Sequence, residues 1–148
     1  AAELTEPLAK VLGQLGSKRA LVVHGEGNLD ELTVTGTTRI SELRDGAVTT
    51  YSVTPEEFGL ERASVADLAA GVDAAASAAQ MRSVLSGAVG AKRDMVLLNS
   101  GAALMAAGQA VDLKTGIALA ADVIDSGRAL AKLDALIALS ARLLADTQ

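Results

Sequence analysis

The sequence predicts an α/β fold with a partial, mostly parallel sheet, a hairpin extension and several flanking alanine-rich helices. Three observations support this fold class. Residues 20–23 form a short apolar run between turn residues, after a helical pattern, which is typical of a buried parallel strand. Asp45-Gly46 separates two β-like stretches and so indicates a hairpin. From residue 64 onward, alanines and apolar residues recur at helical spacing.

The N-terminal elements follow one another with short connections. Residues 3–15 carry an apolar stripe at helical spacing, and Gly16 is expected to end that helix. The strand at 20–23 follows, and then comes a polar loop too rich in glycine to be helical. Residues 37–43 and 48–53 are expected to be the two strands of the hairpin.

The rest of the chain is predicted to be helical. Pro55 is expected at the first position of a helical turn, a place where its missing N–H costs nothing. Five helices are predicted, at 64–70, 73–86, 91–107, 112–125 and 128–145. Asp73 and Asp112 occupy N-cap positions, and Gly87, Gly108 and Gly127 lie where helices end. Glycines in 101–108 are expected to permit close helix packing. Tyr51 and Phe58, the two aromatic residues, are expected to pack under the hairpin.

Composition restricts the class of protein. The 148 residues suit one domain, and a hydrophobic content of 50% excludes intrinsic disorder. The chain has no cysteine, so disulfides and cysteine-based zinc sites are excluded, and a cytoplasmic location is expected. A net charge of −5 argues against a nucleic-acid partner. No membrane span is predicted, because apolar stretches are only a few residues long, and no export signal is predicted, because the sequence shows no basic-then-apolar leader.

The adjacent carboxylates Asp30 and Glu31 are the best candidate site. They lie in the loop after the predicted buried strand, and ligands of open α/β sheets bind beyond the carboxyl ends of strands. Mg²⁺ takes one or two protein carboxylates together with substrate phosphates, so this pair suits a magnesium site. From spacing alone, the alternative that Asp30 and Glu31 are simply solvated loop charges stays open.

The other polar motifs favour structural roles. His24 is expected to hydrogen-bond to the loop backbone, and without a second histidine it cannot anchor a usual zinc site. Lys92-Arg93-Asp94 is interpreted as a solvated helix start. The loop glycines do not form a dinucleotide-binding fingerprint, because Leu29 and Asp30 follow where the third glycine belongs. No catalytic residue and no organic cofactor site are predicted in this segment.

Several blocks, taken together, resemble the anthranilate phosphoribosyltransferase family. They occur in family order and with family spacing over nearly the whole chain. The blocks are residues 21–25, 29–32 (Leu-Asp-Glu-Leu), 35–38 (Thr-Gly-Thr-Thr), 55–60, 84–87, 93–99 and 124–127.

The resemblance implies an enzyme of tryptophan biosynthesis, which transfers phosphoribosyl from phosphoribosyl pyrophosphate to the amine of anthranilate and releases pyrophosphate. It implies that Asp30 and Glu31 hold Mg²⁺ bound to the pyrophosphate. It also implies that residues 1–148 are the C-terminal part of a catalytic α/β domain of the nucleoside phosphorylase/phosphoribosyltransferase type. The family's N-terminal helical domain, with its homodimer contact, and its glycine-rich phosphate loop do not occur in this sequence, so the segment alone is expected to be inactive.

Some positions depart from the family pattern, and alternatives remain. Val72 and Ser77 replace a usual glycine and asparagine, and Ser100-Gly101 replaces an Ala-Ala pair. The chain could instead be a non-catalytic binding module or proteolytic remnant of this fold, or part of a related nucleoside phosphorylase-type transferase. We further expect self-association, through the edge of the 20–23 strand and the apolar stripe of the first helix.

Overall fold

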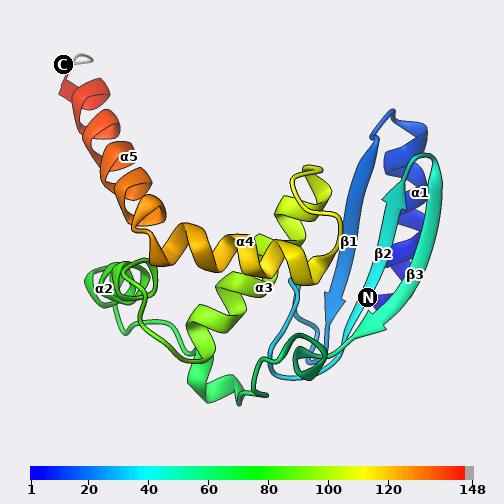
Figure 1. Cartoon of the computed structure of the whole chain (residues 1–148), viewed down its shortest axis with the longest axis horizontal. Coiled ribbons are helices and arrows are strands. Elements are labelled where there is room, and N and C mark those ends of the chain that lie inside the picture. The colour runs from blue at the N-terminus through cyan, green and yellow to red at the C-terminus, as the bar shows by residue number, and fades with distance from the viewer. Residues whose placement is uncertain (146–148) are drawn as a thin grey trace.

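The structure is a computed structural model that describes residues 1–145. A small sheet with one helix on its outer face lies at one end of the molecule, and the remaining helices extend away from it (Figure 1). In chain order the elements are η1 (Ala2–Leu4), α1 (Thr5–Gln14), β1 (Arg19–Gly25), β2 (Thr38–Arg44), β3 (Ala47–Val53), η2 (Pro55–Phe58), η3 (Val65–Leu68), α2 (Ala74–Leu85), α3 (Ala91–Ala106), α4 (Leu113–Asp125) and α5 (Arg128–Ala145). The α/β class predicted from the sequence is confirmed.

The sheet has the order β1-β2-β3, and both pairings are antiparallel. The expectation of a mostly parallel sheet is therefore wrong for residues 1–145. The connection agrees with this pairing, because residues 26–37 form a loop without the helix that usually makes a parallel crossover. The predicted strand at 20–23 exists within β1, but it is half-buried rather than buried, because β1 is an edge strand of this sheet. The predicted hairpin is confirmed, with Arg44 paired to Ala47 around Asp45-Gly46.

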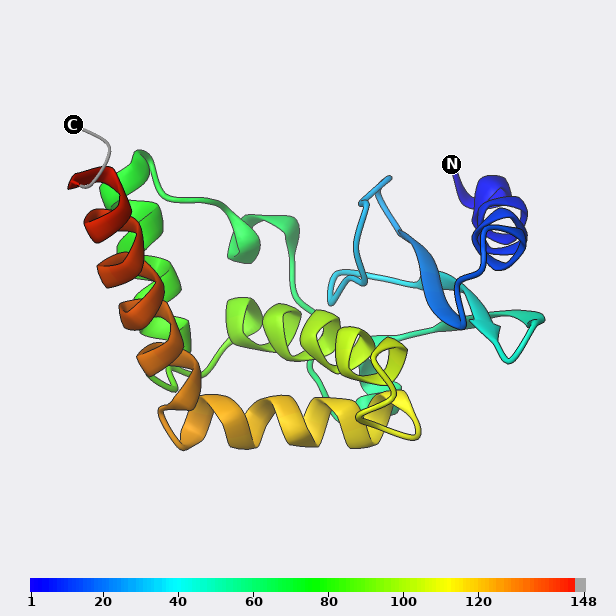
Figure 2. The ribbon, with the colours of Figure 1, turned by 90° about the horizontal axis from the view of Figure 1, so that it is seen from above.

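The two faces of the sheet have different neighbours: α1 lies on one face, whereas α3 and α4 lie at the β1 side of the sheet (Figure 2). On one face α1 packs on β1 and β2, where the buried Ser41 hydroxyl donates to Thr5 Oγ1 at 2.9 Å. On the other face Ile40 and Val53 join the main hydrophobic core, which includes residues of α3 and α4. Tyr51 and Phe58 pack against this core, as predicted. Alternation along each strand thus divides the sheet between two apolar layers.

Helices α3 and α4 cross at a contact between two glycines. A Cβ built on Gly101 would lie 2.7 Å from the Ile117 nitrogen, and one built on Gly116 would lie 2.3 Å from the Gly101 oxygen. The two backbones therefore touch, which confirms that glycine in this stretch serves close helix packing. The contact fixes α3, which carries several residues that face the candidate site.

The helix ends predicted from the sequence are confirmed, except that the helix predicted at 64–70 is shorter than expected. Asp73 and Asp112 each accept a hydrogen bond of 2.7 Å from the third residue of their helix. The helix predicted at 64–70 is only the short turn η3, because Ala69 turns to an extended backbone with ψ of 133°. Gly71 then packs against the start of α2, where an added Cβ would lie 2.4 Å from the Ser77 nitrogen. The chain must leave the helical path to reach this contact.

Helices α1 and α5 each expose several large apolar side chains. None of the residues of α5 is buried, and its exposed large apolar residues are Leu136, Ile137, Leu139, Leu143 and Leu144. On α1, Leu4 at its N-cap, Leu8, Val11 and, just past its end, Leu15 are also exposed. Within residues 1–145, none of the helices combines the length and apolar character that a bilayer crossing requires.

Candidate functional site

The candidate site is the loop of residues 26–37, which leaves the end of β1 and passes along α3 before β2 begins. Asp30 and Glu31 are adjacent residues of this loop, and both are exposed. Neither carboxylate forms a hydrogen bond or an ion pair with another group in the described part of the chain. Both are thus available to a ligand, while the loop on either side of them is held in place.

The first anchor of the loop is a reciprocal backbone contact before the carboxylates. Gly25 N donates to Leu29 O at 2.9 Å, and Leu29 N donates to Gly25 O at 3.2 Å. Gly25 must lack a side chain, since a Cβ there would lie 2.7 Å from the backbone carbonyl oxygen of Glu31. This contact returns the chain to the end of β1 immediately before Asp30.

A tight turn closes this anchor. Gly27 and Asn28 both have positive φ, at 79° and 66°, values that glycine and asparagine tolerate better than other residues. His24 Nε2 lies 3.1 Å from Asn28 Oδ1. The structural role expected for His24 is confirmed, but its partner is a side chain of the turn rather than the loop backbone.

The second anchor follows the carboxylates and comes from α3. Asn99 Oδ1 accepts from Leu32 N at 3.0 Å, and Asn99 Nδ2 donates to Leu32 O at 2.8 Å. The side chains of Leu32 and Val34 are buried in the main core. Asp30 and Glu31 are therefore the two residues between a backbone anchor and a side-chain anchor.

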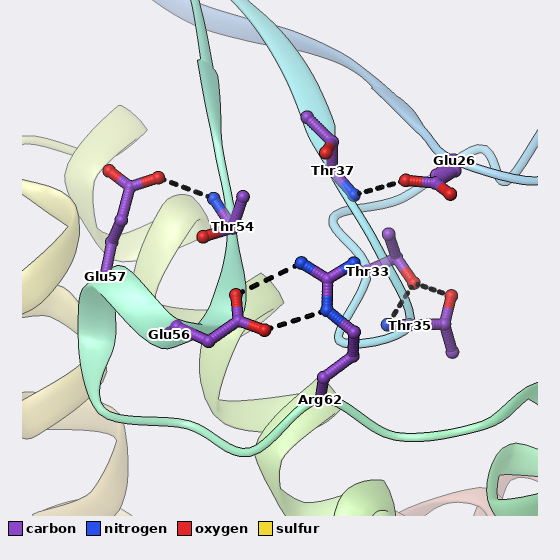
Figure 3. Close-up of polar contacts among 8 residues, drawn as sticks. All are labelled: Glu26, Thr33, Thr35, Thr37, Thr54, Glu56, Glu57 and Arg62. Carbon is purple, nitrogen blue, oxygen red and sulfur yellow. Dashed lines mark hydrogen bonds and ion pairs between the residues drawn. The ribbon is translucent and has the colours of Figure 1, made fainter.

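The second half of the loop is rich in threonine and is held by its own polar contacts (Figure 3). Thr33 Oγ1 lies 2.7 Å from Thr35 Oγ1 and accepts from Thr35 N at 3.0 Å. Glu26 Oε2 accepts from Thr37 N at 2.8 Å, which links the start and end of the loop. Gly36 makes room for Glu26, because a Cβ at Gly36 would lie 2.4 Å from that carboxylate.

An ion pair lies beside this half of the loop. Arg62 Nε donates to Glu56 Oε1 at 2.8 Å, and Figure 3 shows the guanidinium between Glu56 and the threonines of the loop. The hydrogen bond from Arg62 is the main reason that the pKa of Glu56 is lowered to about 2. Glu56 in turn raises the pKa of Arg62, and the charge of Glu26 adds to that effect.

A shallow cleft of about 360 Å³ adjoins Glu31. Leu29, Glu31, Thr35, Val65, Leu68, Ala69, Lys92 and Met95 line it. Lys92 supplies its cationic side and already donates to Ala69 O and, at 3.0 Å, to Gln80 Oε1. The cleft thus brings one candidate metal ligand next to an apolar wall and a tethered lysine.

The start of α3 is less solvated than the sequence suggested. Arg93 is buried and forms an ion pair of 2.9 Å with Asp125 at the end of α4. Burial is the main reason that the pKa of Asp94 is raised. The structural role expected for Lys92-Arg93-Asp94 is right, but the expected solvation is wrong for Arg93, because α4 covers it.

The donor set suits Mg²⁺ rather than a metal enclosed by protein ligands. Residues 1–145 contain no group of three or more His, Cys, Asp or Glu side chains placed to hold a metal ion. Two exposed and unpaired carboxylates match the coordination of Mg²⁺, which keeps waters and takes substrate phosphates as further ligands. Asp30 and Glu31 are thus the residues of this loop that fit the ion.

Sequence reasoning missed Asn99 as part of the site. It lies 67 residues from Leu32, so no local pattern connects the two. A signal did exist, because Asn99 is a polar residue that follows the apolar run 95–98 inside a helix, where asparagine is unfavourable unless its amide is used. That signal does not name the partner.

The chain is similar to a known family and to known proteins. The model of the glycosyl transferase family, a/b domain, matches residues 1–130. The anthranilate phosphoribosyltransferase of Desulfotalea psychrophila is 55% identical over 135 residues, which are 91% of this chain and 39% of that protein. The chain thus spans about 40% of the length of the curated relatives it matches.

Solved structures of two anthranilate phosphoribosyltransferases share the fold of this chain. Anthranilate phosphoribosyltransferase from Thermus thermophilus superposes with a TM-score of 0.84 at 40% identity, covering 93% of this chain and 40% of that chain. The enzyme from Saccharomyces cerevisiae, in complex with PRPP and Mg, superposes with a TM-score of 0.78 at 25% identity, covering 90% and 39%. The proteins that share this fold therefore include an enzyme solved with PRPP and Mg.

Proposed function

Since this chain belongs to the glycosyl transferase family, a/b domain, we propose that it forms part of the active site of an anthranilate phosphoribosyltransferase. The reaction belongs to tryptophan biosynthesis. The bond between ribose C1 and pyrophosphate breaks, a bond from C1 to the anthranilate nitrogen forms, the amine loses a proton, and pyrophosphate leaves. The observation that carries the proposal is the pair Asp30 and Glu31, exposed and unpaired in an otherwise anchored loop.

In this reaction Asp30 and Glu31 would bind Mg²⁺ held by the pyrophosphate. The ion would neutralise negative charge that develops on the departing pyrophosphate. The chain's own contribution is positioning, because the Gly25–Leu29 contact and the Asn99–Leu32 contact fix the backbone on both sides of the carboxylates. A fixed site loses little conformational freedom when the substrate binds.

Further parts of the proposal rest on the relatives. Because the chain spans about 40% of their length, the proposed enzyme needs an additional portion that cradles the diphosphate and binds anthranilate. Residues 1–148 are then part of its catalytic α/β domain, and the complete enzyme is a homodimer. Phosphoribosyl pyrophosphate and anthranilate are its substrates. A cytoplasmic location belongs to the same proposal, supported by a sequence without cysteine.

The test is a chimera. The portion of the Desulfotalea psychrophila enzyme that matches this chain is replaced by residues 1–148, and the consumption of anthranilate is followed by its fluorescence in the presence of phosphoribosyl pyrophosphate and Mg²⁺. We expect turnover that requires Mg²⁺. Asp30→Ala and Glu31→Ala should each lower kcat by roughly 10²-fold, as expected when one electrostatic contact to a developing charge is lost.

Glu3→Ala is the matched control, because Glu3 is also an exposed carboxylate but lies in η1. It should leave kcat unchanged. A folded chimera without any turnover would contradict the proposal and favour a non-catalytic module. A kcat and a Mg²⁺ requirement left unchanged by Asp30→Ala and by Glu31→Ala would refute their assignment as metal ligands. Activity on pyrimidine nucleosides instead of anthranilate would favour a nucleoside phosphorylase-type enzyme.

A further inference from the structure

The carboxylates Asp30 and Glu31 owe their placement to backbone contacts, because neither side chain is tied to another group in the described part of the chain. The direction in which each carboxylate points therefore depends on the peptide planes around it. The plane between Leu29 and Asp30 is fixed by Gly25 of β1, which donates to Leu29 O. The plane between Glu31 and Leu32 is fixed from α3, by Asn99.

The side-chain amide of Asn99 uses both of its ends on one residue of the loop. Its oxygen accepts from Leu32 N at 3.0 Å, and its nitrogen donates to Leu32 O at 2.8 Å. Leu32 N belongs to the peptide that joins Leu32 to Glu31. Holding both polar groups of Leu32 fixes the peptide planes before and after it, which a single hydrogen bond would not do.

Asn99 is itself held in one orientation. Its nitrogen also donates to Met95 O at 3.0 Å, one turn earlier in α3. This third bond settles which end of the amide faces which partner, because only the NH₂ group can donate to both Leu32 O and Met95 O. The rigid helix, rather than the loop, therefore sets the orientation of the clamp.

The apolar anchor of the same residue does not replace this clamp. The Leu32 side chain is 3% exposed and packs in the core, which holds the residue at its place. Packing is non-directional, however, and would allow the backbone to rotate around the buried side chain. Hydrogen bonds are directional, so the amide supplies the orientation that packing lacks.

We propose that Asn99 is a positioning residue for the metal-binding pair, so that divalent-cation affinity at Asp30 and Glu31 depends on the Asn99 amide. This inference rests on the proposed function. Groups that orient metal ligands from behind typically change metal affinity by roughly 10- to 100-fold when they are removed. Because Asn99 acts through the backbone rather than on a carboxylate directly, we expect the lower end, about 10-fold.

The experiment uses the 148-residue chain and Mn²⁺ alone as a paramagnetic substitute for Mg²⁺. Mn²⁺ is titrated into ¹⁵N-labelled protein, and broadening of the amide signals of residues 29–33 gives both the location of the ion and its Kd. Asn99→Leu removes the amide while keeping the volume of the side chain similar. We expect its Kd for Mn²⁺ to rise about 10-fold while α3 stays folded.

Two further variants keep the test decisive. Asn99→Ser, a smaller polar replacement, loses the two-ended clamp and should also weaken Mn²⁺ binding, so it serves if Asn99→Leu fails to fold. Leu104→Ala is the matched control, because Leu104 is a half-buried residue of the same helix that packs on the core away from the loop. It should lower Tm without changing the Kd for Mn²⁺.

The outcomes separate this inference from the proposed function. Broadening in the unsubstituted chain that disappears in Asp30→Ala and Glu31→Ala supports the metal pair. If that holds but Asn99→Leu and Asn99→Ser bind Mn²⁺ with unchanged Kd, Asn99 does not position the pair. An equal loss of affinity in Leu104→Ala would mean that general stability explains the effect, and it would also overturn the inference. If the unsubstituted chain shows no broadening at 29–33, the pair does not bind a divalent cation without pyrophosphate and the inference about Asn99 fails, while the chimera assay still tests the proposed function.

Discussion

The contact between α3 and α4 leaves no room for a side chain at Gly116. A Cβ there would lie 2.3 Å from the Gly101 oxygen and 2.9 Å from the Gly101 carbonyl carbon. These distances are roughly 1 Å shorter than an ordinary van der Waals contact of about 3.5 Å. Both obstructing atoms belong to the backbone of a helix, so a rotation of a side chain cannot relieve the overlap. Gly116→Ala must therefore push the two helices apart.

The expected loss of stability follows from two opposing contributions. In an unobstructed helix, replacing glycine by alanine stabilises by about 1 kcal/mol. Overpacking of a rigid contact costs about 1–3 kcal/mol, and an overlap with backbone belongs to the upper end. The net effect is a decrease of about 2 kcal/mol in the free energy of unfolding, which corresponds to a Tm lower by about 4–8 °C for a chain of this length.

Thermal unfolding followed by circular dichroism measures this effect. Gly13→Ala in α1 is the matched control, because a Cβ at Gly13 would meet only the flexible end of Leu43, at 3.1 Å. Its Tm should stay within a few degrees of that of the unsubstituted chain. A Gly101→Ala/Gly116→Ala double variant should lose less than the sum of the single variants, because the first methyl already separates the helices. An unchanged or raised Tm for Gly116→Ala would refute the packing argument.

Three further predictions concern ionisation and association. Burial, together with the Glu42 carboxylate, raises the pKa of Tyr51 to about 12. Ultraviolet titration of this sole tyrosine should therefore show a midpoint well above 10, and the stability of the fold should fall as pH rises from about 10 towards 12. A midpoint at 10 would contradict this. The Arg62 hydrogen bond lowers the pKa of Glu56 from 4.5 to about 2, so the pair supports the fold above pH 4.5 and the support is lost as pH falls towards 2. Arg62→Gln should weaken this acid dependence, and unchanged acid unfolding would argue against the pair. The exposed apolar stripe of α1 and the free edge of β1 predict self-association. Leu8→Lys should reduce this association, as measured by sedimentation velocity. A monomer at high concentration would show that these surfaces do not associate.

Local signals in the sequence identified the elements whose hydrogen bonds are themselves local. Asp45-Gly46 predicted the hairpin, because these residues tolerate the positive φ that the turn requires, and the structure has φ of 50° and 82° there. Asp73 and Asp112 predicted helix starts in the same way, since a capping carboxylate bonds to an amide only three residues away.

The candidate site was found in part by the same means. Asp30 and Glu31 are adjacent in the chain, so their proximity needs no folding to bring it about, and the predicted strand before them located them at a strand end. Their anchoring was not predictable, because Asn99 reaches Leu32 across 67 residues. The burial of Arg93, which was interpreted as solvated, was not predictable either, because its ion-pair partner Asp125 belongs to another helix.

The tertiary structure alone decided how the pieces face one another. The apolar run 20–23 indicated that a strand forms, but such a run, although typical of buried parallel strands, also occurs in antiparallel sandwich cores. The antiparallel pairing and the edge position of β1 go together with a helix-free loop to β2 and with the packing of α1 on β1 and β2. Backbone conformation depends largely on neighbours in sequence. Strand pairing and burial depend on which distant surfaces meet, and local sequence patterns do not report those contacts.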